Sequence, residues 1–399
     1  MKILSRIKVI DMTEGVAGPY ASTILGDMGA NVIKIERPDG DWGRSSGKKR
    51  GYDGDLNSQF IALNRNKRDL GLDLNKNEGH VILSRLLKNA DVIISNYRPG
   101  VMKRFNLSYE DCRKISPNIT YCTISGFGQK GEISHLPASD TVVQSISGMM
   151  DMIGDRDGQP LRISFPLIDM FAANNAVQAI LLSLYSKKNE EKGAKIDISL
   201  MNTALAMMAN PLSEYLIEGR LPQRHGNQNP SLSPAGSFQT ADGKYITIAV
   251  LRESHWEKLC YAIDHSHLIS DDYFNTNMKR LENREKLNQL LESVFKTKSS
   301  SEWIQKLQSA DVLSAPLNNF EDIIKDHQFT STMPLIEFNL PTETVRVIGN
   351  PISYNEKFFS ADIHPPQKGE HTTEILSEEG YSSLQIKDLY NKGIVFGTD

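Results

Sequence analysis

Apolar residues in the first half of the chain come in short runs, and polar or glycine-containing turns separate these runs. Short apolar runs indicate buried strands, whereas longer segments with apolar residues every three or four positions indicate helices. On this pattern, strands are predicted at residues 7–12, 31–36, 59–63, 91–95, 119–125 and 195–199, and helices at 20–28, 78–89 and 200–218. The alternation of strand and helix predicts an α/β fold with a parallel, Rossmann-like sheet.

The longest apolar segment opens at Phe165 and continues to Leu184. Its apolar residues recur at helical spacing, and Pro166 suits the first helical position because its missing N–H group would be unpaired there. Asp169 follows in the first turn, where free backbone N–H groups and the helix dipole favour a carboxylate. The segment alone favours an acid that only begins a helix, and a buried nucleophile is the alternative.

A segment rich in proline, glycine, asparagine and serine at residues 221–236 indicates a domain boundary or a functional loop. Beyond it, a β-hairpin at 236–250 and three helical segments predict a small α+β domain. The chain then returns to strand and helix patterns. We therefore predict a large Rossmann-like domain that begins with 1–220, a small domain at 226–327, and a return segment at 333–399 that completes the large domain.

Composition and charge narrow the class of protein. The 399 residues are 39% hydrophobic and 24% charged, which suits a globular protein with a large core. The net charge of −4 argues against a nucleic-acid-binding protein. The cysteines Cys112, Cys122 and Cys260 show neither disulfide nor zinc-site spacing. The N-terminus reads as a strand rather than a signal peptide, and the uncharged stretch at 176–185 is too short for a bilayer, so we predict a cytoplasmic protein without membrane association.

The turn after the first predicted strand carries Gly15 and Gly18, which is not the GxGxxG spacing of dinucleotide-binding proteins. A nicotinamide-dependent oxidoreductase with Glu36 as its ribose-binding acid is therefore disfavoured. Two arginines, Arg98 and Arg104, come after the predicted strand 91–95. Because open α/β sheets bind ligands at the carboxyl ends of their strands and arginine suits phosphate, these residues indicate a phosphorylated ligand.

Several short stretches occur in a fixed order along nearly the whole chain. They are residues 9–13, 17–19, 25–36, 40–41 with Arg44, 64–68, 72–73, 96–100, 126–131, Asp169, 240–243, 283–285 with Trp303, Pro316, and 369–372. In this combination the sequence resembles the class III CoA-transferases, the group that includes formyl-CoA transferase and carnitine CoA-transferase.

The resemblance implies a Rossmann-type large domain made from both chain ends, a smaller α+β domain between them, and two chains interlinked in a homodimer. It implies acyl-CoA and a small carboxylic acid as substrates, with no tightly bound cofactor and no metal. The residues that it assigns to coenzyme A follow the predicted strands: Val16, Ala17, Arg37, Leu72, Asp73, Asn96, Tyr97, Arg98 and Arg104.

The resemblance also matches Asp169 to the nucleophile of the family. Its carboxylate would attack an acyl-CoA thioester to give an acyl–aspartyl anhydride; the thiolate would return to form an aspartyl-CoA thioester, and the acceptor acid would then take the CoA. Backbone N–H groups at the helix start and in the loop 226–233 are candidate oxyanion ligands. Ser46 and residues 226–230 replace a tryptophan and a glycine-rich run of formyl-CoA transferases, which argues against oxalate as the substrate.

Other functions remain open. An α-methylacyl-CoA racemase shares this fold but places a histidine before the aspartate equivalent to Asp140, where this chain has Ser139. Because racemisation needs a base on each face of the carbon, a racemase ranks below a transferase. A non-catalytic CoA-binding protein, in which Asp169 only begins a helix, is a further alternative.

Overall fold

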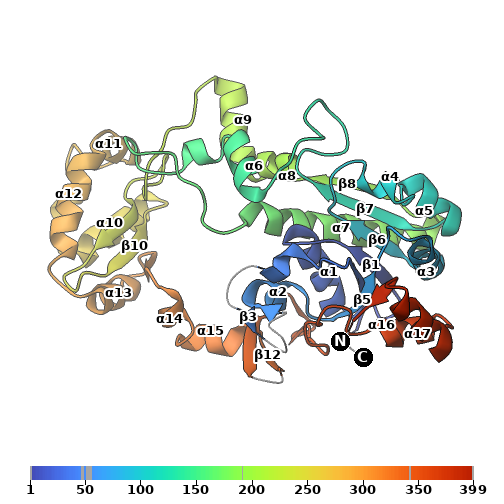
Figure 1. Ribbon diagram of the computed structural model, residues 1–399. Helices are drawn as coiled ribbons and strands as arrows, with labels where there is room; N and C mark the ends of the chain where they lie inside the picture. Colours follow the sequence, from blue (N-terminus) through green and yellow to red (C-terminus); the bar gives the residue numbers. More distant parts are fainter. Residues whose placement is uncertain (1, 46–48, 51–55, 191, 341–342, 398–399) are drawn as a thin grey trace. The chain divides into compact units, whose positions relative to one another are not determined.

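The computed structural model describes residues 2–45, 49–50, 56–190, 192–340 and 343–397 (Figure 1). Contacts divide the chain into two compact units. Unit 1 comprises Met1–Met149, Arg162–Gly219 and Met333–Asp399, and unit 2 comprises Met150–Leu161 and Arg220–Thr332. Both chain ends therefore belong to unit 1, and the short segment 150–161 joins the middle of the chain in unit 2.

A mostly parallel sheet forms the centre of unit 1. Within the described residues it has seven strands: β1 (Lys8–Met12), β2 (Asn31–Glu36), β5 (Lys67–Leu72), β6 (Val92–Ser95), β7 (Thr120–Ser125), β8 (Lys195–Ser199) and β16 (Val395–Phe396). Their order across the sheet is β16-β5-β2-β1-β6-β7-β8, and β16 runs antiparallel to β5. The parallel strands thus wind outward in both directions from β1, so that the connection changes direction between β1 and β6.

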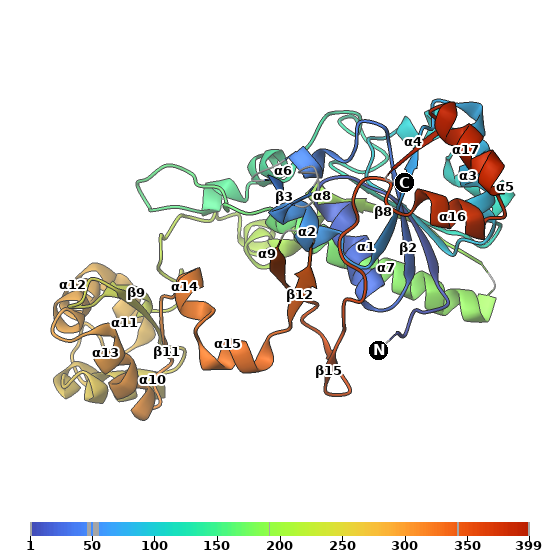
Figure 2. The ribbon, with the colours of Figure 1, turned by 60° about the horizontal axis from the view of Figure 1, so that its bottom comes forward.

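Helices cover both faces of this sheet (Figure 2). The helices α3 (Asn77–Lys88), α5 (Tyr109–Ile115), α16 (Thr372–Glu378) and α17 (Ser383–Asn391) bury one face in a common apolar core with the strands. The helices α1 (Ala17–Asp27), α7 (Leu167–Glu190) and α8 (Leu200–Met207) lie on the other side. Because both faces are covered, the inner strands are buried almost throughout, which explains their continuous apolar runs.

Helix α7 is the longest helix in the part of the chain that the structure describes. From Leu167 to Lys187 it meets the length and hydropathy expected of a membrane span, and it is the one helix of the described residues that does so. The apolar stretch therefore exceeds the residues 176–185 considered from the sequence. In the structure α7 packs against α1, α8, β7 and β8, and 39% of its most apolar window is buried. A core helix of a soluble protein passes the same test, so this helix is weak evidence for a membrane span.

Two predicted elements of unit 1 are wrong. Residues 59–63 form part of helix α2 (Ser58–Leu63) instead of a strand, because the Asn57 side chain accepts a hydrogen bond from the backbone N–H of Phe60 and caps a helix there. The helix predicted at 200–218 is divided at Met208 into α8 and α9 (Ala209–Glu218). Apolar spacing carries no information on either the cap or the break.

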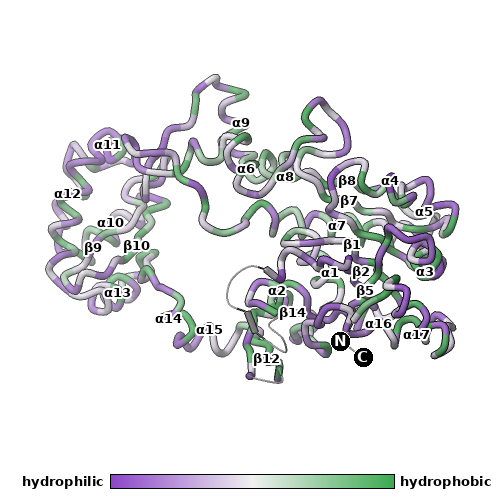
Figure 3. Tube along the Cα trace, in the orientation of Figure 1, coloured by the Kyte–Doolittle hydropathy of each residue, from purple (hydrophilic) through white to green (hydrophobic). Residues whose placement is uncertain are grey.

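Unit 2 is a small α+β structure. Strands β9 (Ala235–Gln239), β10 (Tyr245–Ala249) and β11 (Ser314–Pro316) pair antiparallel. Against them pack α10 (Glu253–Ala262), α12 (Arg284–Phe295) and α13 (Ser300–Ser309), and α11 (Asn277–Glu282) contacts α12. Hydrophobic and hydrophilic residues alternate along α12 (Figure 3), as expected for a helix that buries one face. Its buried face meets Trp303, whose ring stacks edge-on at 5.2 Å from that of Phe295.

Shorter elements complete the two units. They are η1 (Trp42–Ser45), β3 (Lys49–Arg50), β4 (Leu56–Asn57), α4 (Val101–Arg104), α6 (Asp140–Ile146), η3 (Met150–Met152), η4 (Ser266–Ile269), α14 (Phe320–Ile323), α15 (His327–Thr332), β12 (Leu335–Asn339), β13 (Thr344–Ile348), β14 (Ser353–Tyr354) and β15 (Lys357–Phe358).

Candidate active site

A cavity of about 530 Å³ lies in unit 1 where β1, β6 and β7 end, and we call it the strand-end cavity. This is the point at which the strand order changes direction, the place where open α/β sheets bind ligands. Its lining comes from segments far apart in the sequence: Glu14, Val16, Ala17, Arg37, Trp42, Asn96, Tyr97, Arg98, Pro99, Ile124, Ser125, Gly126, Ser134, Leu136, Ala138, Ser139, Asp169 and Leu200.

Asp169 reaches this cavity from the first turn of α7. The start of α7 is held by Asp140, a buried residue of α6 whose Oδ2 accepts hydrogen bonds from the backbone N–H groups of Ile168 (2.7 Å) and Asp169 (3.1 Å). Asp140 is held in turn by Gln144, which donates to Asp140 Oδ1 and accepts from the backbone N–H of Ile163 at 2.8 Å. The first turn of α7 is therefore fixed from outside the helix.

The carboxyl group of Asp169 titrates at an unusual pH. Burial away from water disfavours its charged form, and the nearby Asp140 carboxylate adds like-charge repulsion, so that its pKa rises to about 7. A carboxylate with this pKa is more basic than an ordinary aspartate and remains ionised in about half of the molecules at neutral pH. Such perturbed groups in cavities are candidates for chemistry.

The N–H groups at the start of α7 are all occupied, which is unfavourable for their predicted role as oxyanion ligands. Leu167 N–H donates to the carbonyl of Phe165 at 2.8 Å, and Met170 N–H donates to that of Pro166 at 3.1 Å. The two amides between them donate to Asp140. A free donor is offered by Ser125 at the end of β7 instead, because its hydroxyl is buried, lines the strand-end cavity and has no partner within the described residues.

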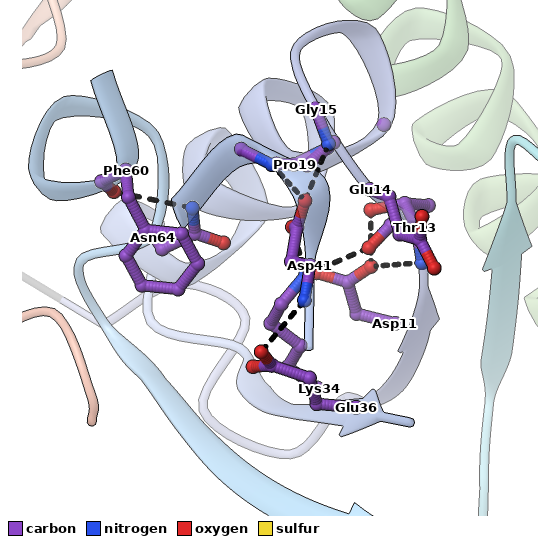
Figure 4. A network of polar contacts seen from close by, with 12 residues as sticks. Asp11, Thr13, Glu14, Gly15, Pro19, Lys34, Glu36, Asp41, Phe60 and Asn64 are labelled. Carbon is purple, nitrogen blue, oxygen red and sulfur yellow. Dashed lines mark hydrogen bonds and ion pairs between the residues drawn. The ribbon is translucent and has the colours of Figure 1, made fainter. Parts of the chain in front are cut away.

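The turn after β1 is held by a buried ion pair (Figure 4). Lys34 Nζ donates to Asp41 Oδ2 at 2.8 Å and to the carbonyl of Thr13 at 2.7 Å. The other carboxylate oxygen of Asp41 accepts from the backbone N–H groups of Gly15 (2.9 Å) and Gly43 (2.8 Å). One carboxylate thus joins the turn after β1 to the loop after β2, two of the segments that line the cavity.

A second set of contacts joins the turn after β1 to the end of β6. The side chain of Asn96 accepts from the backbone N–H of Glu14 at 2.9 Å and donates to its carbonyl at 2.7 Å. The Glu14 carboxylate lies 3.2 Å from Arg37 Nε and accepts a hydrogen bond from the Tyr97 hydroxyl. Burial raises the pKa of Glu14 against the opposing effect of Arg37. Asn96 and Tyr97 therefore line the cavity and also hold Glu14 of its wall in place.

A neighbouring cavity of about 590 Å³ shares Arg37, Tyr97 and Arg98 with the strand-end cavity, and we call it the Arg104 cavity. The residues predicted to bind coenzyme A divide between the two. Val16, Ala17 and Asn96 line the strand-end cavity; Leu72, Asp73 and Arg104 line the Arg104 cavity; Arg37, Tyr97 and Arg98 line both. The structure therefore places all nine residues and Asp169 around two neighbouring cavities of unit 1.

Sequence analysis missed several lining residues. Trp42 lines the strand-end cavity with its side chain half exposed, and its ring packs so closely on Gly15 that a Cβ there would lie 2.0 Å from it. Gly15, with a φ of +80°, was a signal for this close approach. Ser46, where formyl-CoA transferases carry a tryptophan, lies outside the described residues. Ser125 gave no signal, because a serine at a strand end is unremarkable without its surroundings.

Glu36 is engaged in the protein interior. Its carboxylate accepts hydrogen bonds from Arg44 Nε at 2.7 Å and Nη2 at 2.8 Å, and the side chain is almost fully buried. It also accepts from the backbone N–H of Asp41. A carboxylate held in this way has no free geometry for a ribose, which weighs against the oxidoreductase alternative.

Comparison with known proteins identifies the family of the chain. Residues 4–372 match the family described as CoA-transferase family III. The chain is 32% identical over 398 residues to the human succinyl-CoA:glutarate CoA-transferase, covering 99% of this chain and 90% of that protein. It is 32% identical to the succinyl-CoA:mesaconate CoA-transferase of Haloarcula hispanica, with 95% and 97% covered, and 34% identical to the acetyl-CoA:oxalate CoA-transferase of Acetobacter aceti, with 86% and 87% covered.

A solved structure is similar over the whole fold. The CaiB/BaiF family protein from Brucella suis superposes with a TM-score of 0.86 at 31% identity and covers 95% of this chain and 99% of its own. The chain belongs to CoA-transferase family III.

Proposed function

We propose that this protein moves CoA from an acyl-CoA donor to a free carboxylic acid, with Asp169 as the covalent nucleophile. The observation that carries the proposal is the Asp169 carboxyl group itself. It is partly buried in the strand-end cavity, held by the Asp140 cap, and has a pKa near 7. Family membership supplies the reaction class, and this side chain is the candidate for its chemistry.

The steps follow from a carboxylate meeting a thioester. An oxygen of Asp169 attacks the thioester carbonyl carbon, the carbon–sulfur bond breaks, and an acyl–aspartyl anhydride and CoA thiolate result. The thiolate attacks the carboxyl carbon of Asp169, which releases the donor acid and leaves an aspartyl-CoA thioester. The acceptor carboxylate displaces the thiolate to give a second anhydride, and thiolate attack on its acyl carbon regenerates Asp169.

CoA would occupy the two neighbouring cavities. The thioester end belongs beside Asp169 in the strand-end cavity, and the phosphorylated end belongs in the Arg104 cavity. Arg98 and Arg104 support this orientation, because neither forms an ion pair with a carboxylate in the part of the chain that is described. Guanidinium groups that project from strand ends into a cavity suit phosphate oxygens.

We assign oxyanion stabilisation to Ser125. Each tetrahedral intermediate places negative charge on the former carbonyl oxygen, and a donor already in place stabilises that charge most in a site without water. The buried hydroxyl of Ser125 has a proton to donate and no acceptor among the described residues. The N–H groups at the start of α7 are occupied, whereas this hydroxyl lies in the cavity lining without a partner among the described residues.

Short dicarboxylic acids are the substrates that we propose. Two of the similar proteins are named for transfer from succinyl-CoA to glutarate or mesaconate, each a dicarboxylic acid. A racemase reaction is less well supported, since Ser139 stands where a racemase needs a histidine, and the described lining of the strand-end cavity includes no histidine.

We further infer a Rossmann-like large domain and an intertwined, cytoplasmic homodimer. The strand order on either side of β1 supports the first, because it is the order of doubly wound nucleotide-binding sheets. Exposed apolar residues on α9, with Leu216 at 74% and Ile217 at 83% exposure, support the second, because such residues are typical of interfaces.

The direct test replaces the nucleophile. We expect Asp169→Ala to abolish CoA transfer between succinyl-CoA and glutarate, because no other step can proceed without the covalent intermediates. Binding of CoA, measured by calorimetry, should change less than threefold. Asp388→Asn is the matched control, since Asp388 pairs with Lys392 on exposed α17. Wild-type turnover by the Asp169 variant would contradict the proposal.

A further inference from the structure

Unit 2 contains a cavity of about 620 Å³ made entirely from its own residues, and we call it the His225 cavity. Its walls come from the segment 150–161, the loop before β9 and the start of α12. The lining residues are Arg156, Gln223, Arg224, His225, Gln228, Pro230, Leu281, Glu282, Asn283, Arg284, Glu285, Lys286 and Asn288. None of these residues lines the strand-end cavity or the Arg104 cavity.

The charges in this cavity do not cancel. Arg224 is used structurally, because it donates to backbone carbonyls of the segment 150–161 and pairs with Asp151 at 3.2 Å. Glu282 pairs with Lys279 at 3.1 Å. Three cations, from Arg156, Arg284 and Lys286, then face one remaining carboxylate, that of Glu285. The net result is an excess of two positive charges.

The guanidinium group of Arg284 is partly buried, which disfavours its charged form. Its Nη2 donates to the carbonyl of Asn229 at 2.7 Å, and burial lowers the pKa of its guanidinium. No carboxylate pairs with Arg284 or with Arg156 in the described part of the chain. A partly buried arginine that lacks a counter-ion is unfavourable unless an anion binds beside it.

The pKa of His225 is affected by the same excess of positive charge. Burial, Arg284 and Arg156 all lower the pKa of its imidazole. The neutral ring can donate one hydrogen bond without adding charge. Asn288 lines the same cavity, but its buried and unpartnered Oδ1 is an acceptor, so it does not contribute to anion binding. The anion site therefore consists of the neutral His225 ring as donor and the guanidinium groups of Arg156 and Arg284.

We propose that the His225 cavity binds a small dicarboxylate dianion, with the guanidinium groups of Arg156 and Arg284 on its carboxylates. An excess of two positive charges matches a dianion, and guanidinium groups bind carboxylates through paired hydrogen bonds. The volume admits a chain of four to six carbons and does not itself select the chain length. The choice of a dicarboxylic acid rests on the proposed function, whereas the anion site rests on unit 2 alone.

The test follows the His225 imidazole by NMR in the full-length protein with isotope-labelled histidine. His225→Gln assigns the signal. Saturating glutarate should raise the pKa of His225 by about one unit, because an anion near the ring favours its charged form. Arg156→Met should weaken glutarate binding about tenfold, and Arg284→Lys should weaken it as well. Arg252→Met is the control, because Arg252 is an exposed arginine of unit 2 outside the cavity.

Further measurements identify the ligand and distinguish the proposed anion site from the proposed catalytic role of Asp169. Succinate and adipate should bind in the same range as glutarate, and butyrate and inorganic phosphate at least tenfold more weakly. Asp169→Asn should leave the His225 response unchanged, so a failure of the catalytic proposal would not affect this result. A His225 signal that does not respond to glutarate, that responds equally to butyrate or phosphate, or that responds normally in Arg156→Met would overturn the dicarboxylate site.

Discussion

At the scale of single residues, the chemistry depends on how two carboxylates are arranged. Asp140 accepts the backbone N–H groups of Ile168 and Asp169, while its charge raises the pKa of the Asp169 carboxyl group. The same side chain therefore positions the proposed nucleophile and, together with burial, increases its basicity. A more basic carboxylate is a better nucleophile. At neutral pH, however, a larger fraction of it is protonated and cannot attack.

The first prediction is a pH dependence. Because only ionised Asp169 can attack, kcat/KM for acyl-CoA should fall below pH 7 by about tenfold per unit, to about 1% of its plateau at pH 5. Asp140→Asn keeps an oxygen for the helix cap but removes the negative charge. The fall in kcat/KM should therefore occur at lower pH in this variant. A profile of the wild-type enzyme between pH 5 and 9 measures it, and a flat profile down to pH 5 would contradict the assignment.

The same pKa has a consequence for stability. A carboxyl group whose pKa is raised on folding contributes stability below its ordinary value of 3.8 and loses that contribution as the pH rises through about 7. The uncharged Asp169→Asn should therefore melt at a higher temperature than the wild type at pH 8, with a smaller difference at pH 5. Differential scanning calorimetry at the two pH values compares them.

Ser125 gives the second residue-scale prediction. Ser125→Ala should lower kcat by about 100-fold with little change in KM for acyl-CoA, because removal of an oxyanion donor affects the intermediate rather than binding. Ser147→Ala on α6 serves as a control, since Ser147 is not part of the cavity lining. Equal losses in the two variants, or a loss confined to KM, would remove Ser125 from this role.

At the scale of elements, hydrogen bonds join the turn after β1 to the loop after β2 and to the end of β6. Asp41 fastens the turn after β1 to the loop after β2, and Asn96 fastens it to the end of β6. Each contact uses backbone groups of the turn, so its shape is fixed by main-chain geometry and not by loose side chains. A site built on such strand ends is already organised for a large ligand.

The short helix α4 carries the prediction at this scale. Arg104→Ala should raise KM for CoA esters about tenfold and leave kcat nearly unchanged, because Arg104 would contact phosphate rather than the thioester. The effect should shrink at high ionic strength, as expected for an exposed charge pair. Arg113→Ala on α5 is the control, since Arg113 lies outside both cavities. A wild-type KM in the Arg104 variant would exclude this contact.

At the scale of the whole molecule, the proposed homodimer would cover apolar side chains that are exposed on two helices. Leu182 and Tyr185 on α7 are about 70% exposed, and α9 has no buried residue. We expect Leu216→Glu together with Ile217→Glu to convert a dimer to monomers, because both charges would have to lose their hydration in an interface. Light scattering after gel filtration measures the mass, with Leu384→Glu on exposed α17 as control. A dimer unchanged in the double variant would contradict this interface.

The sequence predicts the parallel sheet well because its inner strands are buried on both faces and therefore continuously apolar. It fails at residues 59–63, where the Asn57 cap outweighs apolar spacing, and at Met208. Asp169 is predicted as the nucleophile through resemblance, and Arg98 and Arg104 are predicted from their place after a strand as well. Asp140 and Ser125 become visible only when distant segments meet. Contacts between residues about 30 positions apart, such as Asp140 with Asp169, leave no local pattern.

The most direct test of the central claim is mass spectrometry of the enzyme during turnover with succinyl-CoA and glutarate. Rapid quenching, with and without hydroxylamine, traps activated acyl groups on the protein. We predict a hydroxamate on the peptide that contains Asp169, and none in Asp169→Asn. If Asp169 remains unmodified while glutaryl-CoA accumulates at the wild-type rate, transfer does not pass through this carboxylate.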